Sequence, residues 1–428
     1  MLKKLKSLVA SSPLLQVASF NSLNIAVKFL TSLAVSKLIA LLLGPSGLTF
    51  IGNLRNALSI FQNFATGGLT KAIIKYTGET KNDHVAFQSF ISTLFWALIF
   101  LSLVIFVFVF GFSKTLSNFV FGETSFAYVF KWTAVLLPVY GLNAFLLAIL
   151  NGLSQFNKVI RINLFTHILN LLVFSYCIYV FGLSGALMAV VIVPSASFIL
   201  TLLLSSQQFN FFKVDWKIFS VNQLKNFGQY AFMTLISAIS FPLVFLGIRQ
   251  LLSNQIGIDE AGYWEANFRL STFYLIFMQS LLNLYVLPKL VEAQSEKSFK
   301  SVVYNFYKQV IPLFSIGLLL VFLLRKYLVL LVFSEEFLPV TSLLGWQIIG
   351  DFFRILSLVM VYQFHAKKML WHYIITDLFL ALGLYFSAIQ LIDIYGLQGV
   401  VIGHALTYVL YFILIGFIFR RTFFISKL

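Results

Sequence analysis

Long apolar windows occupy most of this chain, and they restrict its fold more than any other feature of the sequence. Each window has about 20 mostly apolar residues, enough for one helix to cross the hydrocarbon core of a bilayer. The alternation of apolar and polar residues that marks a membrane-spanning β-strand is absent, so we predict helices. The twelve windows are 16–43, 47–74, 87–112, 125–150, 160–181, 185–206, 226–253, 260–288, 301–324, 338–364, 372–392 and 398–419.

The composition agrees with a chain that lies mostly in lipid. Hydrophobic residues make up 60% of it and charged residues only 10%, whereas about a quarter of the residues in a soluble domain are charged. The single cysteine, Cys177, lies in an apolar window, so neither an internal disulfide nor redox chemistry is expected. We therefore predict an all-α membrane protein with about 12 transmembrane helices.

Lysine and arginine are distributed unequally between alternate connectors. One set of connectors carries nineteen of these residues, and the other carries three, namely Lys114, Arg325 and Lys326. Because cytoplasmic loops are enriched in Lys and Arg, both termini are predicted to lie in the cytoplasm. The same bias explains much of the net charge of +16, so no nucleic-acid partner is expected.

The two halves of the chain resemble each other at an offset of 214 residues, which is half of its length. Six windows in each half predict two lobes of the same orientation, as in transporters built from parallel repeats, whose substrate site lies between the lobes. We predict an N-lobe at 1–206, a cytoplasmic connector at 207–225 and a C-lobe at 226–428. The matching positions are Arg55 and Arg269, Lys75 and Lys289, Trp132 and Trp346, and 182–185 and 396–399.

The charged residues inside the windows are mostly basic. A charge in a bilayer is costly and points to a function unless its side chain can extend to the interface. Arg249 and three of the lysines lie near window ends, where such an extension is expected, whereas Lys28, Arg55, Arg269 and Arg354 lie deeper. Leaving out Lys71, Arg161 and Glu260, which lie close to window ends, the basic residues are Lys28, Lys37, Arg55, Lys131, Arg249, Arg269, Lys308 and Arg354, and the acidic residues are Glu265, Asp351 and Asp377.

Polar residues near Arg55 and Arg269 recur at helical spacing and predict one polar face on each helix. Such a face either lines a wet cavity or forms hydrogen bonds with neighbouring helices. Arg55 has no acidic residue on its own helix, because Ile51 stands where the second half has Glu265. Phosphate oxygens would suit its forked guanidinium. The two polar stripes are Arg55, Ser59, Gln62 and Thr66, and Glu265, Arg269, Thr272, Gln279 and Asn283.

Two acid–base pairs each allow two interpretations. Glu265 precedes Arg269 by four residues and can pair with it along one helix. Asp351 and Arg354 are three residues apart and form either an internal ion pair or a protonatable site. A protonatable Asp351 or Glu265, with Arg354, would couple transport to a gradient of H⁺ or Na⁺.

The sequence lacks the common catalytic motifs. It has no GxxxxGK[ST] loop, no HExxH motif and no cluster of Cys and His at metal-binding spacing. The connectors are too short for a soluble catalytic domain. We therefore expect a transporter rather than an enzyme, with no cofactor and no metal.

Four segments of the chain resemble the Wzx-type flippases, especially those that move O-antigen units and the lipid III of enterobacterial common antigen. The segments are LIALLLGPSGLTFIGNLRN (38–56), GGLTKAIIKY (67–76), NLYVLPKL (283–290) and GWQIIGDFFR (345–354). The resemblance extends over nearly the whole chain and places it in the multidrug/oligosaccharidyl-lipid/polysaccharide exporter superfamily, with a MATE-like fold.

The resemblance implies a substrate and a site. The substrate would be an undecaprenyl-diphosphate-linked oligosaccharide, moved from the cytoplasmic to the outer leaflet of the bacterial inner membrane through a cationic cavity. A polysaccharide polymerase and chain-length machinery would be further partners. Arg55 and Arg269, with Lys28, would hold the diphosphate, and Lys75 and Lys289 would recruit it. The remaining candidate substrate-binding residues are Arg249, Gln62 and Asn283.

Three alternatives compete with this hypothesis. A multidrug exporter of the same fold would favour an acidic cavity, which the excess of basic residues disfavours. A flippase for another lipid-linked precursor would also meet a diphosphate, so charge does not separate it from the first hypothesis. A membrane-embedded glycosyltransferase or polymerase would need catalytic groups in long loops, and the connectors are short.

Overall fold

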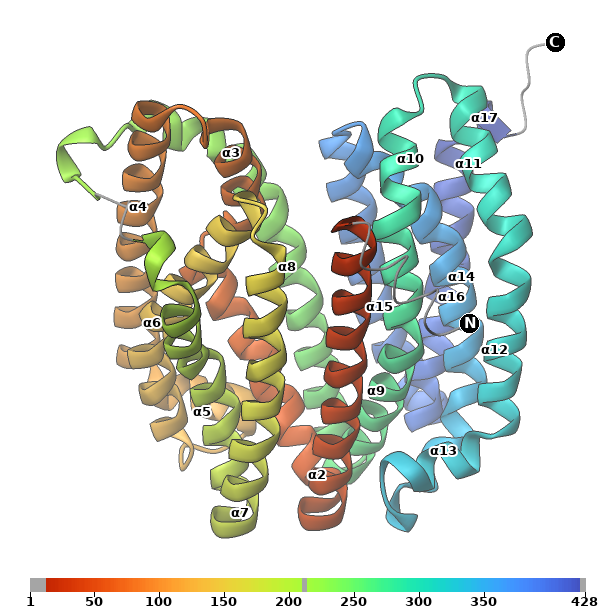
Figure 1. Ribbon diagram of the computed structural model, residues 1–428. Coiled ribbons are helices and arrows are strands. Elements are labelled where there is room, and N and C mark those ends of the chain that lie inside the picture. The colour runs from red at the N-terminus through yellow and green to blue at the C-terminus, as the bar shows by residue number, and fades with distance from the viewer. Residues whose placement is uncertain (1–12, 210–213, 424–428) are drawn as a thin grey trace, which may run out of the picture. The chain divides into compact units, whose positions relative to one another are not determined.

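The computed structural model describes residues 13–209 and 214–423, and helices form nearly all of these residues (Figure 1). No strand occurs in the two described ranges. The all-helical prediction is therefore confirmed. The principal helices of the first half are α2 (Pro13–Ala65), α3 (Thr70–Thr80), α4 (His84–Gly111), α5 (Ser113–Phe121), α6 (Ala127–Gly152) and α7 (Phe156–Phe209), followed by the short 3₁₀ helix η1 (Trp216–Ile218).

The second half begins with two long helices and continues through shorter ones. A single π-helical turn, η2 (Leu282–Val286), interrupts the second of the long helices. The elements are α8 (Val221–Gln255), α9 (Ile258–Leu281), α10 (Leu287–Glu292), α11 (Glu296–Gln309), α12 (Ile311–Leu323), α13 (Arg325–Val332), η3 (Glu335–Phe337), α14 (Val340–Ala366), α15 (Leu370–Tyr395), α16 (Leu397–Ile418) and α17 (Arg420–Phe423).

Two elements are each long enough to cross a bilayer twice. The described residues contain ten candidate membrane-spanning helices, and two of these, Ser22–Thr80 and Phe156–Ser205, have 59 and 50 residues. A single crossing needs about 20 residues. The backbone changes direction inside them at Gly44 and at Gly182, where φ is positive. Counting each long element as two crossings agrees with about twelve spans.

The backbone confirms the internal repeat at one pair of matched glycines. Gly182 has φ 56° and ψ −135°, and Gly396, which lies 214 residues later, has φ 57° and ψ −139°. This region of φ and ψ is open essentially only to glycine. Each glycine therefore makes the same turn between two successive helices of its own half.

The chain divides into two compact units, and each is described separately. The first unit contains residues up to 42 and 53–239, and the second contains 43–52 and 240–428. The segment 43–52 belongs to the second unit because it packs on α9. There the Thr49 hydroxyl donates to the Ile258 carbonyl at 2.8 Å, and a side chain on Gly262 would lie 2.1 Å from the Pro45 carbonyl oxygen.

Within the first unit, α6 packs against α7, α4 and α3. Residues 214–220, the part of the predicted connector that follows residue 213, lie on α4. The Ser92 and Thr93 hydroxyls accept hydrogen bonds from the backbone N–H groups of Asp215 and Ser220, each at 3.1 Å. The Trp216 ring meets the Trp96 ring edge to face at 5.1 Å.

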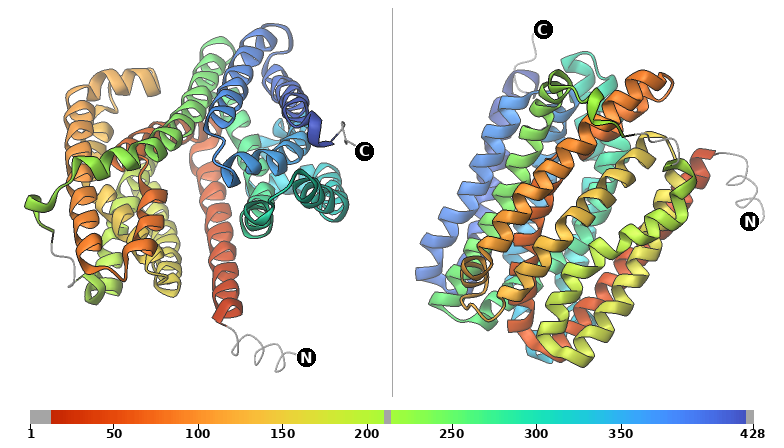
Figure 2. Two further views of the ribbon diagram at one scale, coloured as in Figure 1. Left: turned by 90° about the horizontal axis from the view of Figure 1, so that it is seen from above. Right: turned by 90° about the vertical axis from the view of Figure 1, so that its left-hand side faces the viewer.

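Within the second unit, α14 lies beside α16 over much of its length, and it also contacts α9 (Figure 2). A large apolar cluster packs against these helices, with Phe306, Ile355 and Phe364 almost fully buried. This apolar packing fixes α9, α14 and α16 side by side. It therefore determines which polar side chains of these three helices can meet.

Candidate functional site

The predicted cationic face of the first unit lies on α2. Lys28 and Arg55 are exposed and Gln62 is half-buried. Thr66, at the end of the same predicted stripe, does not face solvent. It is buried, and its hydroxyl donates to the Gln62 carbonyl at 3.0 Å. Lys28 lies near His167 of α7.

Neighbouring residues in the motif GNLRN point in different directions, which orients Arg55. Asn53 is buried, and its side-chain amide donates to the Val120 carbonyl at the end of α5, at 3.1 Å. Leu54 is completely buried. These two side chains fix this turn of α2 against the core of the first unit. Arg55 therefore extends away from that core.

Glu265 holds two arginines in a buried ion cluster of the second unit. Its carboxylate accepts from Arg249 Nη2 of α8 at 2.7 Å and from Arg249 Nε at 3.1 Å. It also accepts from Arg269 Nε, one turn along α9, at 2.9 Å. The three residues are 2–7% exposed. The expectation that Arg249 extends to the interface is therefore wrong, because its guanidinium is drawn inward by Glu265.

The close packing of the ion cluster depends on the glycine that begins GNLRN. A Cβ on Gly52 would lie 2.9 Å from the Glu265 carboxylate carbon and 3.1 Å from the Arg249 guanidinium carbon. The backbone of segment 43–52 therefore lies directly against the cluster. Of the two interpretations given for Glu265 and Arg269, the structure shows the ion pair. It adds Arg249 as a second partner, which spacing on one helix could not reveal.

Asp351 is the centre of a second buried polar network, between α9, α14 and α16. Its side chain is 0% exposed. One carboxylate oxygen, Oδ2, accepts from the Ser271 hydroxyl at 2.5 Å, from the Tyr274 hydroxyl and from Gln347 Nε2 at 3.2 Å. The other oxygen, Oδ1, lies 3.2 Å from His404 Nε2. Four side chains from three helices thus surround this acid.

Arg354 lies farther from Asp351 than these four side chains do. Its Nη1 is 3.9 Å from Asp351 Oδ1, and its guanidinium lies over the Tyr408 ring at 5.6 Å. Its side chain is 22% exposed, whereas that of Asp351 is fully buried. The predicted pair of Asp351 and Arg354 is therefore present but loose, and Arg354 is the only one of the two with access to the surface.

The absence of a side chain at Gly350 leaves the space that the His404 imidazole occupies. A Cβ on Gly350 would lie 2.2 Å from His404 Cδ2 and 3.1 Å from the Cα of Ala405. Helices α14 and α16 consequently approach each other closely at this level. His404 is buried, and its imidazole contacts Asp351.

Lys75 and Lys289, the repeat-related lysines, are both exposed and both lie beside a tyrosine. Lys75 Nζ is 3.8 Å from Glu79 and 5.1 Å from the Tyr76 ring centre. Lys289 Nζ is 2.7 Å from the Tyr285 hydroxyl and 4.1 Å from the centre of its ring. Repeat-related positions thus share a lysine next to an aromatic ring, although the partner tyrosine differs.

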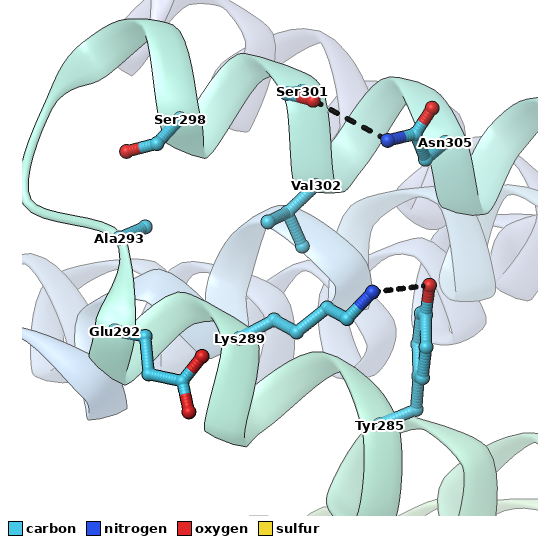
Figure 3. A pocket seen from close by; sticks show the side chains of 8 residues that line it. All are labelled: Tyr285, Lys289, Glu292, Ala293, Ser298, Ser301, Val302 and Asn305. Carbon is cyan, nitrogen blue, oxygen red and sulfur yellow. Dashed lines mark hydrogen bonds between the residues drawn. The ribbon is translucent and has the colours of Figure 1, made fainter.

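A pocket of about 330 Å³ lies between Lys289 and the first turns of α11. Figure 3 shows Lys289 reaching toward Tyr285 on one wall, opposite the hydrogen-bonded pair of Ser301 and Asn305. Glu292 belongs to the same wall as Lys289. Asn283, another predicted site residue, is outside this pocket lining and accepts from the Tyr362 hydroxyl at 3.1 Å.

Sequence reasoning missed most of the Asp351 network. Gln347 could have been found, because it lies one turn before Asp351 on the same helical face. Ser271, Tyr274 and His404 could not, because only the packing of α9 and α16 against α14 places them beside the acid.

Comparisons with known proteins agree with the architecture. The structure matches that of a multidrug-resistance MATE family transporter of the MOP superfamily with a TM-score of 0.75 and 13% identity, over 94% of this chain and 96% of the other. It matches the lipid II flippase MurJ with a TM-score of 0.72 and 12% identity, over 95% of this chain and 87% of the other. At these identities the matches show the fold alone, and they confirm the MATE-like prediction.

Two sequence comparisons are more specific. The lipid III flippases of Escherichia coli (strain K12) and Shigella flexneri are each 25% identical to this chain over 391 residues, which are 90% of this chain and 93% of the relative. A family model described as "Polysaccharide biosynthesis protein" matches residues 38–342, which is well over half of the chain. The predicted resemblance is confirmed, and the chain belongs to this family of polysaccharide biosynthesis proteins.

Proposed function

We propose that this protein is a flippase for an undecaprenyl-diphosphate-linked oligosaccharide, which it moves from the cytoplasmic to the outer leaflet of a bacterial inner membrane. The observation that carries the proposal is the similarity to the lipid III flippases along 90% of the chain. The matched family and the MOP-superfamily fold support a transporter rather than an enzyme. The positive-inside bias supports cytoplasmic termini.

The chemistry of the substrate explains why a cationic face is needed. A diphosphate cannot enter hydrocarbon without losing its hydration, which costs several kcal/mol or more for each charge. Exposed cations on a membrane-spanning helix can replace part of that hydration. Lys28 and Arg55, both exposed on α2, are the residues we propose for this role. Gln62, two turns after Arg55, would supply a neutral donor.

The arginines of the second unit do not have the role that the match between Arg269 and Arg55 suggests. Arg249 and Arg269 are buried and held by Glu265, so we propose that they support the helix packing behind the site. Lys75 and Lys289 are exposed, and we propose that they attract the diphosphate at the cytoplasmic surface. Polysaccharide polymerase and chain-length proteins remain partners that the resemblance implies.

A flipping assay in proteoliposomes tests the role of Arg55. The probe is lipid III, and the readout is the fraction that becomes accessible to a membrane-impermeant reagent. A hydrogen bond to a charged group contributes roughly 1.5–3 kcal/mol, so Arg55→Ala should lower the rate about 10- to 100-fold. Arg55→Lys should retain part of the activity, since it keeps the charge but loses the fork.

The matched control is Arg161→Ala, which removes an exposed arginine in the first turns of α7. It should flip lipid III at the wild-type rate. Wild-type rates in both Arg55 variants, at normal protein levels, would remove Arg55 from the mechanism. Failure of the wild-type protein to flip lipid III, with activity on another diphosphate-linked glycan, would change the glycan but keep the function.

A further inference from the structure

We propose that the pocket between α10 and α11 binds the headgroup of a zwitterionic membrane lipid, with the phosphate at Lys289 and a primary ammonium group at Glu292. The lipid class is phosphatidylethanolamine. All residues that line the pocket belong to the second unit. Binding of a membrane lipid goes beyond the proposed function, and only the last experiment below, on transport, rests on that function.

Glu292 carries a charge that its position on the helix disfavours. It is the last residue of α10, and it is exposed. Because the free carbonyls at a helix C-terminus carry partial negative charge, cations are favoured there and carboxylates are not. The Glu292 carboxylate has neither an ion pair nor a hydrogen bond with another described residue. A lysine does reach this helix end, but Lys367 donates to the Val291 carbonyl, at 3.2 Å. A cationic ligand would compensate the charge of Glu292.

Lys289 is well placed to pair with Glu292, yet its ammonium group is directed elsewhere. The two residues are three apart on α10, a spacing at which side chains of one helix can meet. Lys289 Nζ lies 2.7 Å from the Tyr285 hydroxyl instead. Figure 3 shows it directed at Tyr285, with the Glu292 carboxylate at the other end of the pocket. The pocket therefore has a cation and a phenol at one end and an anion at the other.

The two ends match the two charges of such a headgroup. At the first end, Lys289 can donate to a phosphate, and the Tyr285 hydroxyl, which accepts from Lys289, can donate its own hydrogen to the same phosphate. At the second end, the ionised Glu292 carboxylate can only accept hydrogen bonds, so its ligand has to donate. A primary ammonium group supplies three N–H donors and the opposite charge. A phosphate joined to a primary ammonium group therefore satisfies both ends.

The size and the opposite wall of the pocket also fit a headgroup. A volume of about 330 Å³ is at the lower end of the range of roughly 300–1,000 Å³ for ligand pockets. This suits a headgroup better than an oligosaccharide. On the opposite wall, Asn305 uses one amide hydrogen toward Ser301, at 3.3 Å. Its second amide hydrogen can be donated to a phosphate or ester oxygen of the lipid.

Apolar side chains near the pocket are placed for the acyl chains of a lipid. Leu284, Val291 and Tyr304 are each more than half exposed. They belong to Ile258–Glu292 and Glu296–Leu323, two candidate membrane-spanning segments that end and begin at the pocket. The positive-inside bias predicts that this helix end is cytoplasmic. The bound lipid would therefore belong to the cytoplasmic leaflet.

Glu292 favours a zwitterionic lipid over an anionic one. Phosphatidylglycerol and undecaprenyl diphosphate carry negative charge without an ammonium group, so either would be repelled by Glu292 while it is attracted by Lys289. The ammonium group of phosphatidylcholine has the right charge, but it is fully methylated and cannot donate a hydrogen bond. Glu292→Gln should therefore weaken binding of phosphatidylethanolamine and strengthen binding of the anionic lipids. The opposite signs separate the possible occupants.

Native mass spectrometry of the full-length protein tests the headgroup specificity. One lipid is added at a time, either phosphatidylethanolamine or phosphatidylcholine with the same acyl chains. The wild type should retain about 2- to 5-fold more phosphatidylethanolamine, the range expected for an exposed ion pair. Glu292→Gln should abolish this preference. The matched controls Glu296→Gln and Lys297→Ala remove exposed charges of the same connector outside the pocket lining, and they should keep it.

Two further variants test each end of the pocket. Lys289→Ala should lower retention of both lipids about 2- to 5-fold, because both contain the phosphate. Glu292→Lys should change the preference to phosphatidylglycerol. An unchanged preference for phosphatidylethanolamine in Glu292→Gln would overturn the proposal, as would equal retention of all lipids by the wild type. Stronger retention of undecaprenyl diphosphate by Glu292→Gln, without any effect on phosphatidylethanolamine, would assign the pocket to the transported lipid and also overturn the proposal.

The consequence for transport is tested separately, in proteoliposomes that flip lipid III. A bound headgroup occupies Lys289, so a diphosphate that arrives there has to displace it. Vesicles of phosphatidylethanolamine should therefore need a higher lipid III concentration for half-maximal flipping than vesicles of phosphatidylcholine, by about the same 2- to 5-fold. Glu292→Gln, in the same two vesicles, should lack this difference.

The two kinds of failure can be distinguished. Specific lipid binding without any effect of the vesicle lipid on flipping would overturn the competition at Lys289 and leave the lipid site. A wild-type protein that flips no lipid-linked glycan in either vesicle would contradict the proposed function, while the preference measured by mass spectrometry would still stand.

Discussion

Replacing Glu265 by glutamine should destabilise the protein strongly, because the Glu265 carboxylate pairs with two arginines in a buried cluster. Its carboxylate accepts three charge-assisted hydrogen bonds, two from Arg249 and one from Arg269. Removing one member of a buried ion pair costs about 3–5 kcal/mol, since it leaves an uncompensated charge. All three side chains are at least nine-tenths buried, so solvent screening offsets little of this cost.

Thermal unfolding of the purified protein, followed by the fluorescence of its six tryptophans, measures the effect. For a unit of this size each kcal/mol shifts Tm by roughly 2–4 °C, so Glu265→Gln should lower Tm by about 6–20 °C. The matched control replaces the whole cluster with Arg249→Met, Glu265→Leu and Arg269→Met. This triple variant should be more stable than the single one, as the repeat suggests: the positions that match Arg249 and Glu265 are the buried residues Val35 and Ile51.

The reasoning would be refuted by a Glu265→Gln variant that unfolds within a degree of the wild type. It would also be refuted by a triple variant that is less stable than the single one. Either result would mean that Arg249 and Arg269 do not depend on Glu265 in the membrane. They would then return to the set of candidate substrate-binding residues.

Three further substitutions test other parts of the structure by thermal unfolding or transport. Gly350→Ala should cost roughly 1–3 kcal/mol, because its Cβ would lie 2.2 Å from His404 Cδ2; Gly416→Ala, with open space around it, should not destabilise. Gly182→Ala should cost about 1–3 kcal/mol through backbone strain alone, because no atom lies within 4 Å of its added Cβ; an unchanged Tm would contradict the assigned turn. Lys289→Ala should leave Tm unchanged, since Lys289 is exposed, but raise the lipid III concentration needed for half-maximal flipping; a lower Tm would indicate a structural role instead.

The sequence alone was sufficient for the membrane class, the helices and the repeat. Lipid offers no hydrogen bonds to the backbone, so apolar windows of this length must be helical whatever their neighbours are. The turns at Gly182 and Gly396 are likewise local, since each is set by the backbone of one glycine that the repeat matches. Features that depend on a single helix or a single turn could therefore be predicted from the pattern of residues.

The partners of the charged residues were decided by tertiary structure. Arg55 and Arg269 match in the repeat, yet Arg55 is exposed while Arg269 is buried beside Glu265. Spacing could suggest the pair on α9, but it could not place Arg249 of α8 there. In a medium that screens charge poorly, the energy of each ion depends on which helices pack beside it.

The same limit applies to Asp351. Its window contains an acid three residues before Arg354, and this spacing predicted either an internal ion pair or a protonatable site. Packing of α9 and α16 against α14 instead surrounds the acid with neutral donors and brings in His404 from 53 residues away. The sequence by itself determined that the chain spans a membrane and carries unusual charges there. Only the tertiary structure decided which charges are paired, because pairing depends on contacts between helices that no single window contains.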